Sequence, residues 1–344
     1  MRIPDRKILY RRGLQLLFIL LTLGTLVFLD QVLSFKSGHG IDQARGLYAQ
    51  PRNTVDVVLM GSSHIHCDVN TGLLWEQEGI AAYDYSAAEQ PLWITYHYLK
   101  EFCRYQDPKV VVLDLYSPAR FKDNYQYQWL HESLNGMRPS LNRLQMLLTS
   151  CEPDRLQEFY PPFVNYHSRY DELAREDWLY PFTWKRDLRS FKGFTPYFEV
   201  SPQTRPVLTE ETSGGLTVKS ADYLQKIMDY CREREIQLFL IVTPYVTIES
   251  DQRVYNRIEE IAQQNGLAFH SAYYHYDTMS LDFENDFSDD SHLNYRGARK
   301  FTEHLCSQLK ARYDLPDHRG DPRYSSWDDN AAKIRGEIAL HERS

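Results

Sequence analysis

Two short motifs contain residue types that together could perform acyl transfer. The first is Gly61-Ser62-Ser63-His64, which directly follows an apolar, β-branched run at residues 55–60. A serine at such a strand-to-helix turn exposes its hydroxyl, and its own backbone N–H near a helix N-terminus can face a developing oxyanion. The glycine before it permits the tight turn. Ser63 is therefore the candidate nucleophile, with its backbone N–H as a candidate oxyanion donor.

The second motif is Asp-Asp-Ser-His at residues 289–292, directly before an apolar helical pattern at residues 295–313. Asp289 and His292 are three residues apart, so the carboxylate can hold one imidazole nitrogen while the other faces a serine. His292 is then expected to act as general base and afterwards as general acid. A purely structural alternative is that the two serines cap a helix and the aspartates form a solvated turn.

The chain between these motifs follows the pattern of an α/β domain. Short apolar runs typical of buried parallel strands occur at residues 55–60, 80–83, 109–115, 236–242 and 267–269. Helical patterns lie between them, at residues 91–105, 220–234, 251–265 and 295–313. This alternation predicts a three-layer α/β/α sandwich with a mostly parallel sheet. Right-handed crossovers would place both motifs at one edge of that sheet, where ligand sites form.

An N-terminal apolar run predicts one transmembrane helix. Residues 1–13 are basic, and the apolar run at residues 14–33 approaches the roughly 20 residues that a membrane-spanning helix needs. The basic flank is expected to stay in the cytoplasm, which places the rest of the chain outside it. A cleaved signal peptide is the alternative, but no small-x-small cleavage site follows the run, which favours an uncleaved anchor.

The remaining segments complete the predicted organisation. A connector at residues 34–53 leads to the α/β domain at residues 54–313. Within this domain the alternation stops at residues 116–215, which we interpret as an insertion that could cap the site. Residues 314–344 read as a polar, peripheral C-terminal tail.

The amino-acid composition disfavours two classes of function. The 39 basic and 47 acidic residues give a net charge of −8, which disfavours nucleic-acid binding. The 5 cysteines form no Cys-x-x-Cys pair, which disfavours a structural zinc site. His64, His66 and Cys67 cluster near Asp68, so a metal-dependent hydrolase that also uses His292 remains an alternative. One short segment supplies at most two well-aimed ligands, so we expect no metal and no organic cofactor.

These residues resemble the motif blocks of the SGNH/GDSL hydrolases. Gly61-Ser62-Ser63 is similar to the first block of that family, and Asp289-x-x-His292 is similar to its last block. The resemblance covers about residues 54–313 and implies a flavodoxin-like sandwich. It also implies Ser63 as nucleophile, His292 as base and Asp289 as the acid that orients it.

The chain also departs from the family pattern. Ser62 stands where the family has an aspartate, and Ser86 is the closest equivalent of the second block's oxyanion glycine. The third block, Gly-x-Asn-Asp, is missing, and Tyr116 stands at its place. Ser86, Tyr116 and His64 are therefore further candidates for oxyanion or substrate binding, beside the Ser63 backbone. With these departures and its N-terminal anchor, the chain is more similar to the membrane-anchored branch of the family. That branch includes the D-alanine transfer protein of teichoic-acid synthesis and the alginate and peptidoglycan O-acetyltransferases.

The resemblance implies a single-pass, membrane-anchored, extracytoplasmic serine esterase or acyltransferase. Its expected substrates are O-acyl groups on cell-envelope glycans or other acylated polymers. A multispanning membrane O-acyltransferase is a further candidate partner. Hydrolysis and transfer share one acyl-enzyme, so the three residues do not distinguish them. The alternative is a non-catalytic protein with the same fold that serves as binding or assembly partner of such a membrane acyltransferase.

Overall fold

The computed structural model describes residues 6–36, 38, 40–123, 127–159 and 166–343. The chain divides into two compact units. The anchor unit comprises Met1–Lys36 and Asp154–Trp184, and the sheet unit comprises Ser37–Pro153 and Lys185–Ser344.

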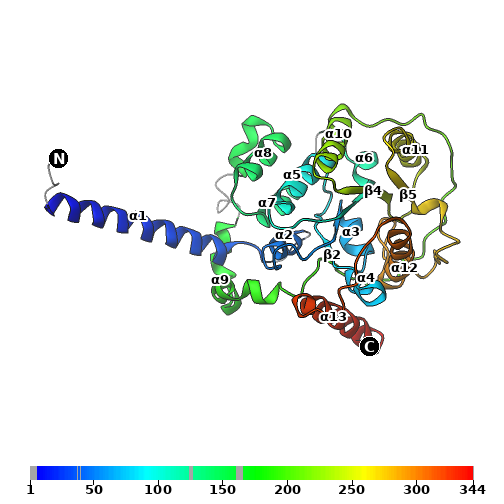
Figure 1. The fold of residues 1–344 in the computed structure, drawn as a ribbon. Coiled ribbons are helices and arrows are strands. Elements are labelled where there is room, and N and C mark those ends of the chain that lie inside the picture. Colours follow the sequence, from blue (N-terminus) through cyan, green and yellow to red (C-terminus); the bar gives the residue numbers. More distant parts are fainter. Residues whose placement is uncertain (1–5, 37, 39, 124–126, 160–165, 344) are drawn as a thin grey trace. The chain divides into compact units, whose positions relative to one another are not determined.

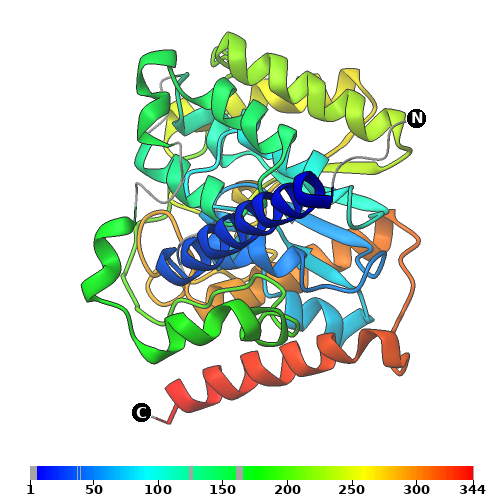
Figure 2. The ribbon, with the colours of Figure 1, turned by 90° about the vertical axis from the view of Figure 1, so that its left-hand side faces the viewer.

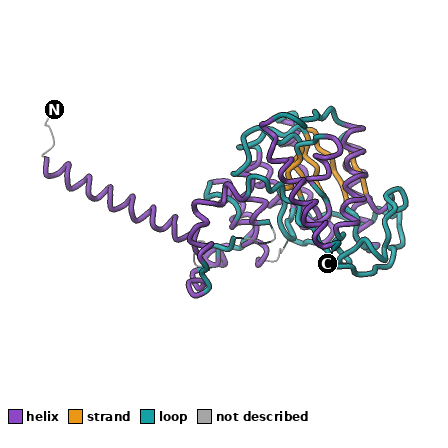
Figure 3. The backbone as a smooth tube through the Cα atoms, turned by 90° about the horizontal axis from the view of Figure 1, so that it is seen from below, coloured by secondary structure: helices purple, strands orange, loops and turns teal. Residues whose placement is uncertain are grey.

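A five-stranded, all-parallel sheet lies inside the sheet unit, with helices around it (Figures 1 and 3). Its order is β2-β1-β3-β4-β5. The strands are β1 (Val57–Met60), β2 (Ala82–Asp84), β3 (Val110–Asp114), β4 (Gln237–Val242) and β5 (Ala268–Ser271). The first three strands are buried along their whole length, which explains their apolar, β-branched composition. The predicted α/β class and parallel sheet are confirmed.

The longer helices of the sheet unit fall into two packed groups. In one, α5 contacts both α8 and α10; in the other, α4 contacts both α12 and α13. A further long helix, α11, packs against β5 and α6. The α-helices are α2 (Ile41–Leu47), α3 (Ser63–Asp68), α4 (Thr71–Glu78), α5 (Leu92–Phe102), α6 (Tyr116–Arg120), α7 (Tyr127–Asn135), α8 (Leu141–Ser150), α10 (Val218–Glu233), α11 (Glu249–Gln264), α12 (Tyr295–Arg312) and α13 (Ser325–His341). Two short 3-10 helices, η4 (Ala272–Tyr274) and η5 (Pro322–Tyr324), complete this set.

The C-terminal segment differs from the expected polar tail. Residues 325–341 form α13, which lies beside α4 (Figures 1 and 2). Trp327 is fully buried, and its indole N–H donates to the Ala82 carbonyl of β2 at 3.1 Å. Ala331 and Ile334 are buried on the same face. These three apolar residues are spaced one and two turns apart among polar residues, so the helix is amphipathic although its average composition is polar.

The expected insertion at residues 116–215 is not one continuous cap. Residues 154–184 belong to the anchor unit, whereas the parts on either side belong to the sheet unit. After this excursion, residues 195–203 run without regular structure along the sheet unit. Their backbone forms hydrogen bonds with three separate segments. Thr195 N–H donates to His66 O of α3 (2.7 Å), Tyr295 N–H at the start of α12 donates to Tyr197 O (2.8 Å), and Ser201 N–H donates to Phe287 O in the loop before α12 (2.9 Å).

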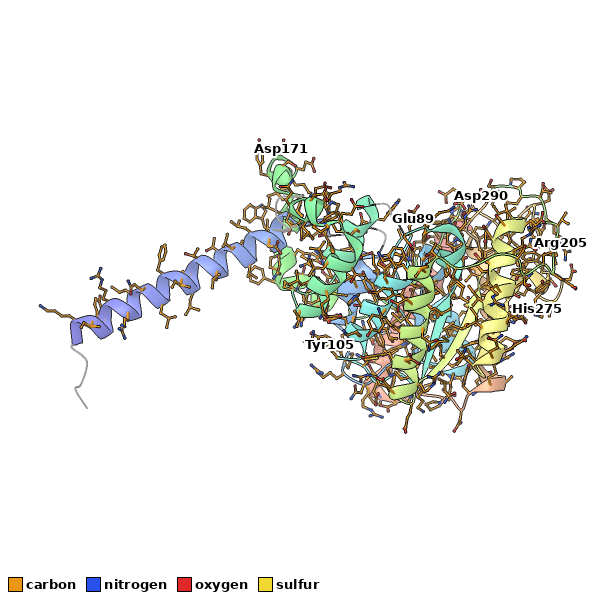
Figure 4. The ribbon with its side chains drawn as sticks, turned by 90° about the horizontal axis from the view of Figure 1, so that it is seen from above. Glu89, Tyr105, Asp171, Arg205, His275 and Asp290 are labelled. Carbon is orange, nitrogen blue, oxygen red and sulfur yellow. The ribbon has the colours of Figure 1, made fainter. Side chains whose placement is uncertain are left out.

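The loops that follow the strands gather at one end of the sheet unit. In Figure 4, Glu89, from the loop after β2, and Asp290, from the loop before α12, lie at the same end. Tyr105, which precedes β3, lies at the opposite end. The candidate site therefore occupies the edge formed by the carboxyl ends of the strands, as open parallel sheets predict.

The anchor unit contains one long apolar helix and three shorter elements. Helix α1 (Arg6–Leu33) includes the stretch Tyr10–Leu33, which is long and apolar enough to cross a membrane. The shorter elements are η1 (Pro153–Glu158), η3 (His167–Asp171) and α9 (Arg175–Asp187), of which Pro153 and residues 185–187 are assigned to the sheet unit. The side chains of α1 from Tyr10 to Val27 are exposed, whereas Phe28 and the residues after it are mostly partly covered.

Candidate active site

The turn after β1 presents Ser63 to the site. Gly61 has a φ of +150°, which L side chains rarely adopt. A Cβ at this position would lie 2.8 Å from the Asp114 Cβ, so the turn passes too close to the end of β3 for any side chain. Ser63 then begins α3 with its side chain partly exposed, while Ser62 and His64 on either side are fully buried. The turn thus selects one serine for exposure.

The structure brings the three residues of the two motifs together. Ser63 Oγ lies 2.8 Å from His292 Nε2. On the other side of the ring, His292 Nδ1 lies 3.1 Å from both carboxylate oxygens of Asp289. With its proton on Nδ1, a neutral imidazole would donate to the carboxylate and accept from the hydroxyl. This is the geometry of a serine held ready for deprotonation.

The loop that contains Asp289 fixes the carboxylate. Asp289 Oδ1 also accepts the backbone N–H groups of Ser291 and His292, each at 2.7 Å. Burial would raise the pKa of Asp289, but the hydrogen bonds from the His292 ring and these two N–H groups outweigh it, so the pKa is lowered. The carboxylate therefore stays ionised, although its side chain is 49% exposed.

A buried aspartate links the helix that begins with Ser63 to the loop that contains His292. Asp68 is the last residue of α3, and its Oδ1 accepts the backbone N–H of Leu293 at 3.0 Å. Its second oxygen has no hydrogen-bond partner among the described residues. Burial raises the pKa of this carboxyl well above its usual range. One six-residue helix thus carries Ser63 at its start and, at its end, an anchor for the residue after His292.

His64 lines the back of the site instead of facing it. Its ring is fully buried and stacks on the Tyr116 ring with centroids 3.7 Å apart. Its Nδ1 lies 3.1 Å from Thr243 Oγ1, at the end of β4. Burial, reinforced by the neighbouring His292, lowers the pKa of His64 well below its usual value, so this imidazole is neutral. Its ring lies 5.0 Å from that of His292.

The side chain of Ser86 and the backbone N–H of Tyr116 form hydrogen bonds with groups other than Ser63. Ser86 Oγ donates to Asp84 Oδ1 at 2.8 Å and lies 2.9 Å from His66 Nδ1. The backbone N–H of Tyr116 donates to Asp114 Oδ2 at 3.2 Å. Within the described ranges, neither residue forms a hydrogen bond with the Ser63 hydroxyl. The backbone N–H of Ser63 has no hydrogen-bond acceptor in the described part of the chain, so it stays an oxyanion candidate.

Three residues make contacts beside the site that the sequence does not indicate, although Asp68 belongs to the cluster considered above as possible metal ligands. The Tyr197 ring meets the His292 ring edge-on, with centroids 5.5 Å apart. It comes from the irregular segment at residues 195–203, whose sequence has no periodic signal. Thr243 and Asp68 had weak signals, because one directly follows a predicted strand and the other ends the helix that Ser63 begins.

The geometry gives no support to the metal-dependent alternative. Across the described residues, no group of three His, Cys, Asp or Glu side chains is arranged to hold a metal ion. The Nδ1 atoms of His64 and His66 are hydrogen-bonded to Thr243 and Ser86, respectively. These bonds orient the two rings toward separate partners.

A cavity of about 390 Å³ adjoins the site through Tyr197. Phe191, Phe194 and Pro196 contribute to its lining, together with His66. Charged and amide side chains contribute from the start of α2 and from α13, namely Asp42, Gln43, Asn330, Lys333 and Glu337. This mixture of aromatic rings and polar groups suits a polar ligand, which would lie next to Tyr197, whereas Ser63 and His292 do not line the cavity.

Comparison with known proteins adds one partial match. A protein-family model that carries no family description matches residues 204–314. The match includes Asp289 and His292 but not Ser63, and it covers less than half of the chain. No curated protein matches the chain.

Proposed function

We propose that this protein is a membrane-anchored, extracytoplasmic serine esterase or acyltransferase that transfers or removes O-acyl groups on cell-envelope glycans. The observation that carries the proposal is the contact between Ser63 Oγ and His292 Nε2 at 2.8 Å, with Asp289 against the opposite ring nitrogen. Nucleophile, base and orienting acid thus stand in the order that acyl transfer needs.

The reaction would proceed in two halves. His292 Nε2 takes the proton of Ser63 as the serine oxygen attacks the acyl carbonyl, and the resulting tetrahedral intermediate carries the negative charge on the former carbonyl oxygen. When this intermediate collapses, protonated His292 returns the proton to the leaving alcohol or thiol, and the acyl group stays on Ser63. In the second half, His292 deprotonates water or a glycan hydroxyl, which attacks the acyl-enzyme and releases Ser63 with its proton.

Asp289 would act on this reaction through His292. Its ionised carboxylate keeps the imidazole proton on Nδ1 and stabilises the imidazolium that forms in each half. The backbone N–H groups of Ser63 and Ser86 are the proposed donors to the oxyanion. No metal or organic cofactor takes part in this scheme.

The finer fold assignment is part of the proposal. We assign the sheet unit to a three-layer, flavodoxin-like α/β/α sandwich of the SGNH hydrolase type. Support comes from the strand order β2-β1-β3-β4-β5, which is the flavodoxin order, and from the two separate groups of helices. In this order, Ser63 follows β1 beside the point where the chain reverses its direction across the sheet.

The orientation of α1 in the membrane would determine on which side of the membrane the reaction takes place. With the basic flank of α1 in the cytoplasm, Ser63 and His292 would face the cell envelope. A tethered enzyme meets envelope polymers at high effective concentration, which favours an envelope glycan as acceptor. The polar and aromatic lining of the cavity beside Tyr197 is compatible with such an acceptor.

A fluorophosphonate probe tests the proposal because it reacts covalently with activated serines. Full-length protein in detergent is treated with the probe, and peptide mapping locates the label. We expect the label on Ser63, and we expect Ser63→Ala and His292→Ala to abolish it. Ser62→Ala is the matched control, since the Ser62 hydroxyl is buried and makes no hydrogen bond in the described structure. Label on any serine other than Ser63 would refute the assignment.

The non-catalytic alternative rests on one observation. The backbone N–H of Tyr116, at the place of the family's third block, is taken up by Asp114, which leaves the oxyanion with fewer donors. A folded protein that takes no label in detergent or in native membranes would favour a binding or assembly role. Labelling in native membranes alone would indicate an enzyme that needs its membrane partner.

A further inference from the structure

Helix α9 of the anchor unit carries an exposed apolar stripe. Trp178, Leu179 and Phe182 are 47%, 44% and 77% exposed. At about 100° per residue, these three positions lie within one third of the helix circumference. Large aromatic side chains exposed together on one helix face usually mark an interaction surface.

This stripe continues from the apolar surface of α1. The Phe28 ring of α1 contacts the rings of Trp178 and Phe182, with centroids 6.3 and 6.2 Å apart. Phe28 belongs to the stretch Tyr10–Leu33, which is long and apolar enough to span a bilayer. The side chains of α1 before Phe28 are exposed and almost entirely apolar from Leu14 on. The stripe on α9 therefore extends a surface whose expected solvent is lipid.

Polar contacts fix α9 at the end of α1. Arg169 Nη1 donates to the carbonyls of Leu33 and Ser34, each at 2.7 Å. These carbonyls close the C-terminus of α1, where a cation is electrostatically favoured. Lys36 Nζ lies 3.1 Å from Asp177 Oδ1 in the first turn of α9. The Tyr166 hydroxyl also donates to Asp30. This set of contacts makes the position of α9 along α1 specific.

The length of α1 gives the depth of this contact. If Arg12 marks the cytoplasmic boundary, Phe28 lies about 24 Å further along the helix at about 1.5 Å per residue. The hydrocarbon core of a bilayer is about 30 Å thick, which places Phe28 about 6 Å inside its outer boundary. Asp30, about 27 Å along the helix, would then lie about 3 Å inside this boundary. Leu33, whose carbonyl accepts from Arg169, would lie at about 31.5 Å, which places the Arg169 guanidinium at the headgroup level.

The charges of α9 also suit a lipid surface. At about 100° per residue, three cations of α9 fall on the same side of the helix as the stripe, namely Arg175, Lys185 and Arg186. Two acidic residues, Glu176 and Asp187, fall on the opposite side. Cations that flank an apolar stripe are typical of helices that lie in the membrane interface and contact anionic headgroups. Aromatic side chains such as Trp178 prefer the same depth.

We propose that α9 is an interfacial helix, with Trp178, Leu179 and Phe182 inserted into the outer leaflet at the boundary between headgroups and acyl chains. The inference rests on the proposal that α1 spans the membrane. The protein would thus be held by two elements, a spanning helix and a helix in the interface that packs on it. The segment at residues 154–184 would serve to contact the membrane instead of capping the site.

Spin labels at three positions test the insertion. Full-length protein is reconstituted in vesicles of phosphatidylcholine and phosphatidylglycerol, in a Cys103→Ser background because the other four cysteines are buried. Labels replace Phe182, Leu20 on α1, and Leu148, an exposed leucine on α8 that is the matched control. Frequent collisions of a spin label with oxygen indicate that the label lies in lipid, because oxygen dissolves in the bilayer. Frequent collisions with a water-soluble nickel chelate indicate that the label is exposed to water. We expect the label at 182 to favour oxygen severalfold over nickel relative to the label at 148, and the label at 20 to lie deepest.

The outcomes separate the two proposals. If position 182 is as accessible to nickel as position 148 while position 20 lies in lipid, the interfacial helix is refuted and the anchor stands. If position 20 is itself in water, α1 does not span the membrane, and both proposals fail. If position 182 is in water in vesicles but is shielded from both reagents in native membranes, the stripe binds a membrane protein, which overturns the lipid assignment.

Discussion

Asp68 Oδ1 accepts the backbone N–H of Leu293 at 3.0 Å, across a sequence separation of 225 residues. Asp68 ends the helix that Ser63 begins, and Leu293 follows His292. Both residues are fully buried. The contact therefore positions the His292 loop relative to the Ser63 turn through a single hydrogen bond that involves neither the Ser63 nor the His292 side chain.

We predict that Asp68→Leu slows the reaction of Ser63 by at least tenfold. The leucine leaves the buried N–H of Leu293 without an acceptor, at a cost of about 1–3 kcal/mol, and the loop can relieve this cost by moving His292 away. The measurement is the rate of fluorophosphonate labelling of Ser63, with thermal unfolding as a check that the variant is folded.

Asp68→Asn is the matched control for this variant. The amide keeps an oxygen acceptor for Leu293, and it is neutral like the protonated carboxyl that burial favours. Labelling should therefore stay within about threefold of wild type. Equal loss of labelling in both variants would mean that the carboxylate charge matters, contrary to the positioning role.

The ring of His292 should lose its orientation in Asp289→Asn. The asparagine side chain is neutral, so it lacks the negative charge that keeps the His292 proton on Nδ1. We therefore expect the labelling rate of Ser63 to fall by about 10²–10⁴-fold. Asp290→Asn is the matched control, because Asp290 precedes Ser291 in the same loop and does not contact the ring of His292. If the two variants were equally active, Asp289 would have no role in the site.

The sheet was predictable because its signal is local. Buried parallel strands need continuous apolar runs, so residues 55–60, 109–115 and 236–242 are recognisable from composition alone. Right-handed connections then predict that the ends of these strands meet at one edge, whereas the order β2-β1-β3-β4-β5 is given by the structure. Helix α13 was missed because average polarity hides an apolar stripe that only its spacing reveals, as Trp327 and Ile334 illustrate.

The site was predictable to the extent that its residues flank strands and helices. Ser63 and His292 follow and precede regular elements, so their shared edge could be inferred before any distance was known. Tyr197 could not be inferred, because an irregular segment brings it to the ring of His292 through long-range backbone bonds. Ser86 is predicted as the equivalent of a backbone N–H donor, and the hydrogen bonds of its hydroxyl to Asp84 and His66 leave that N–H as the candidate donor.

Helix α13 should be essential for stability. Trp327 is fully buried, donates to the carbonyl of Ala82, and has Lys192 Nζ 3.9 Å from its ring centroid. We predict that Trp327→Ala lowers the free energy of unfolding by about 3–5 kcal/mol, as for other large buried side chains. Urea unfolding followed by circular dichroism measures the change. Leu340→Ala, on the same helix but 70% exposed, should change it by less than about 0.5 kcal/mol.

A histidine cluster at the edge of the sheet should make stability depend on pH. His270 Nε2 lies 3.0 Å from His304 Nε2, and the His270 ring stacks on His275 with centroids 4.6 Å apart. Burial lowers the pKa of His270 to about 3, and the neighbouring His275, His304 and Arg312 add to this effect. The unfolded chain binds a proton on this residue near pH 6.5, whereas the folded chain does not. The unfolded state therefore binds more protons between about pH 6.5 and pH 3, so stability is lost as the pH falls through this range.

His270→Gln removes this titration. The glutamine also loses the contact with His304, so the variant is expected to be less stable at pH 7.5, where the wild-type ring is neutral. The decisive quantity is the drop in the urea midpoint from pH 7.5 to pH 5, which should be smaller in His270→Gln than in wild type because one fewer group binds a proton on unfolding. An equal drop in both proteins would mean that His270 is already protonated in the folded state, and that the acid sensitivity of the domain has another source.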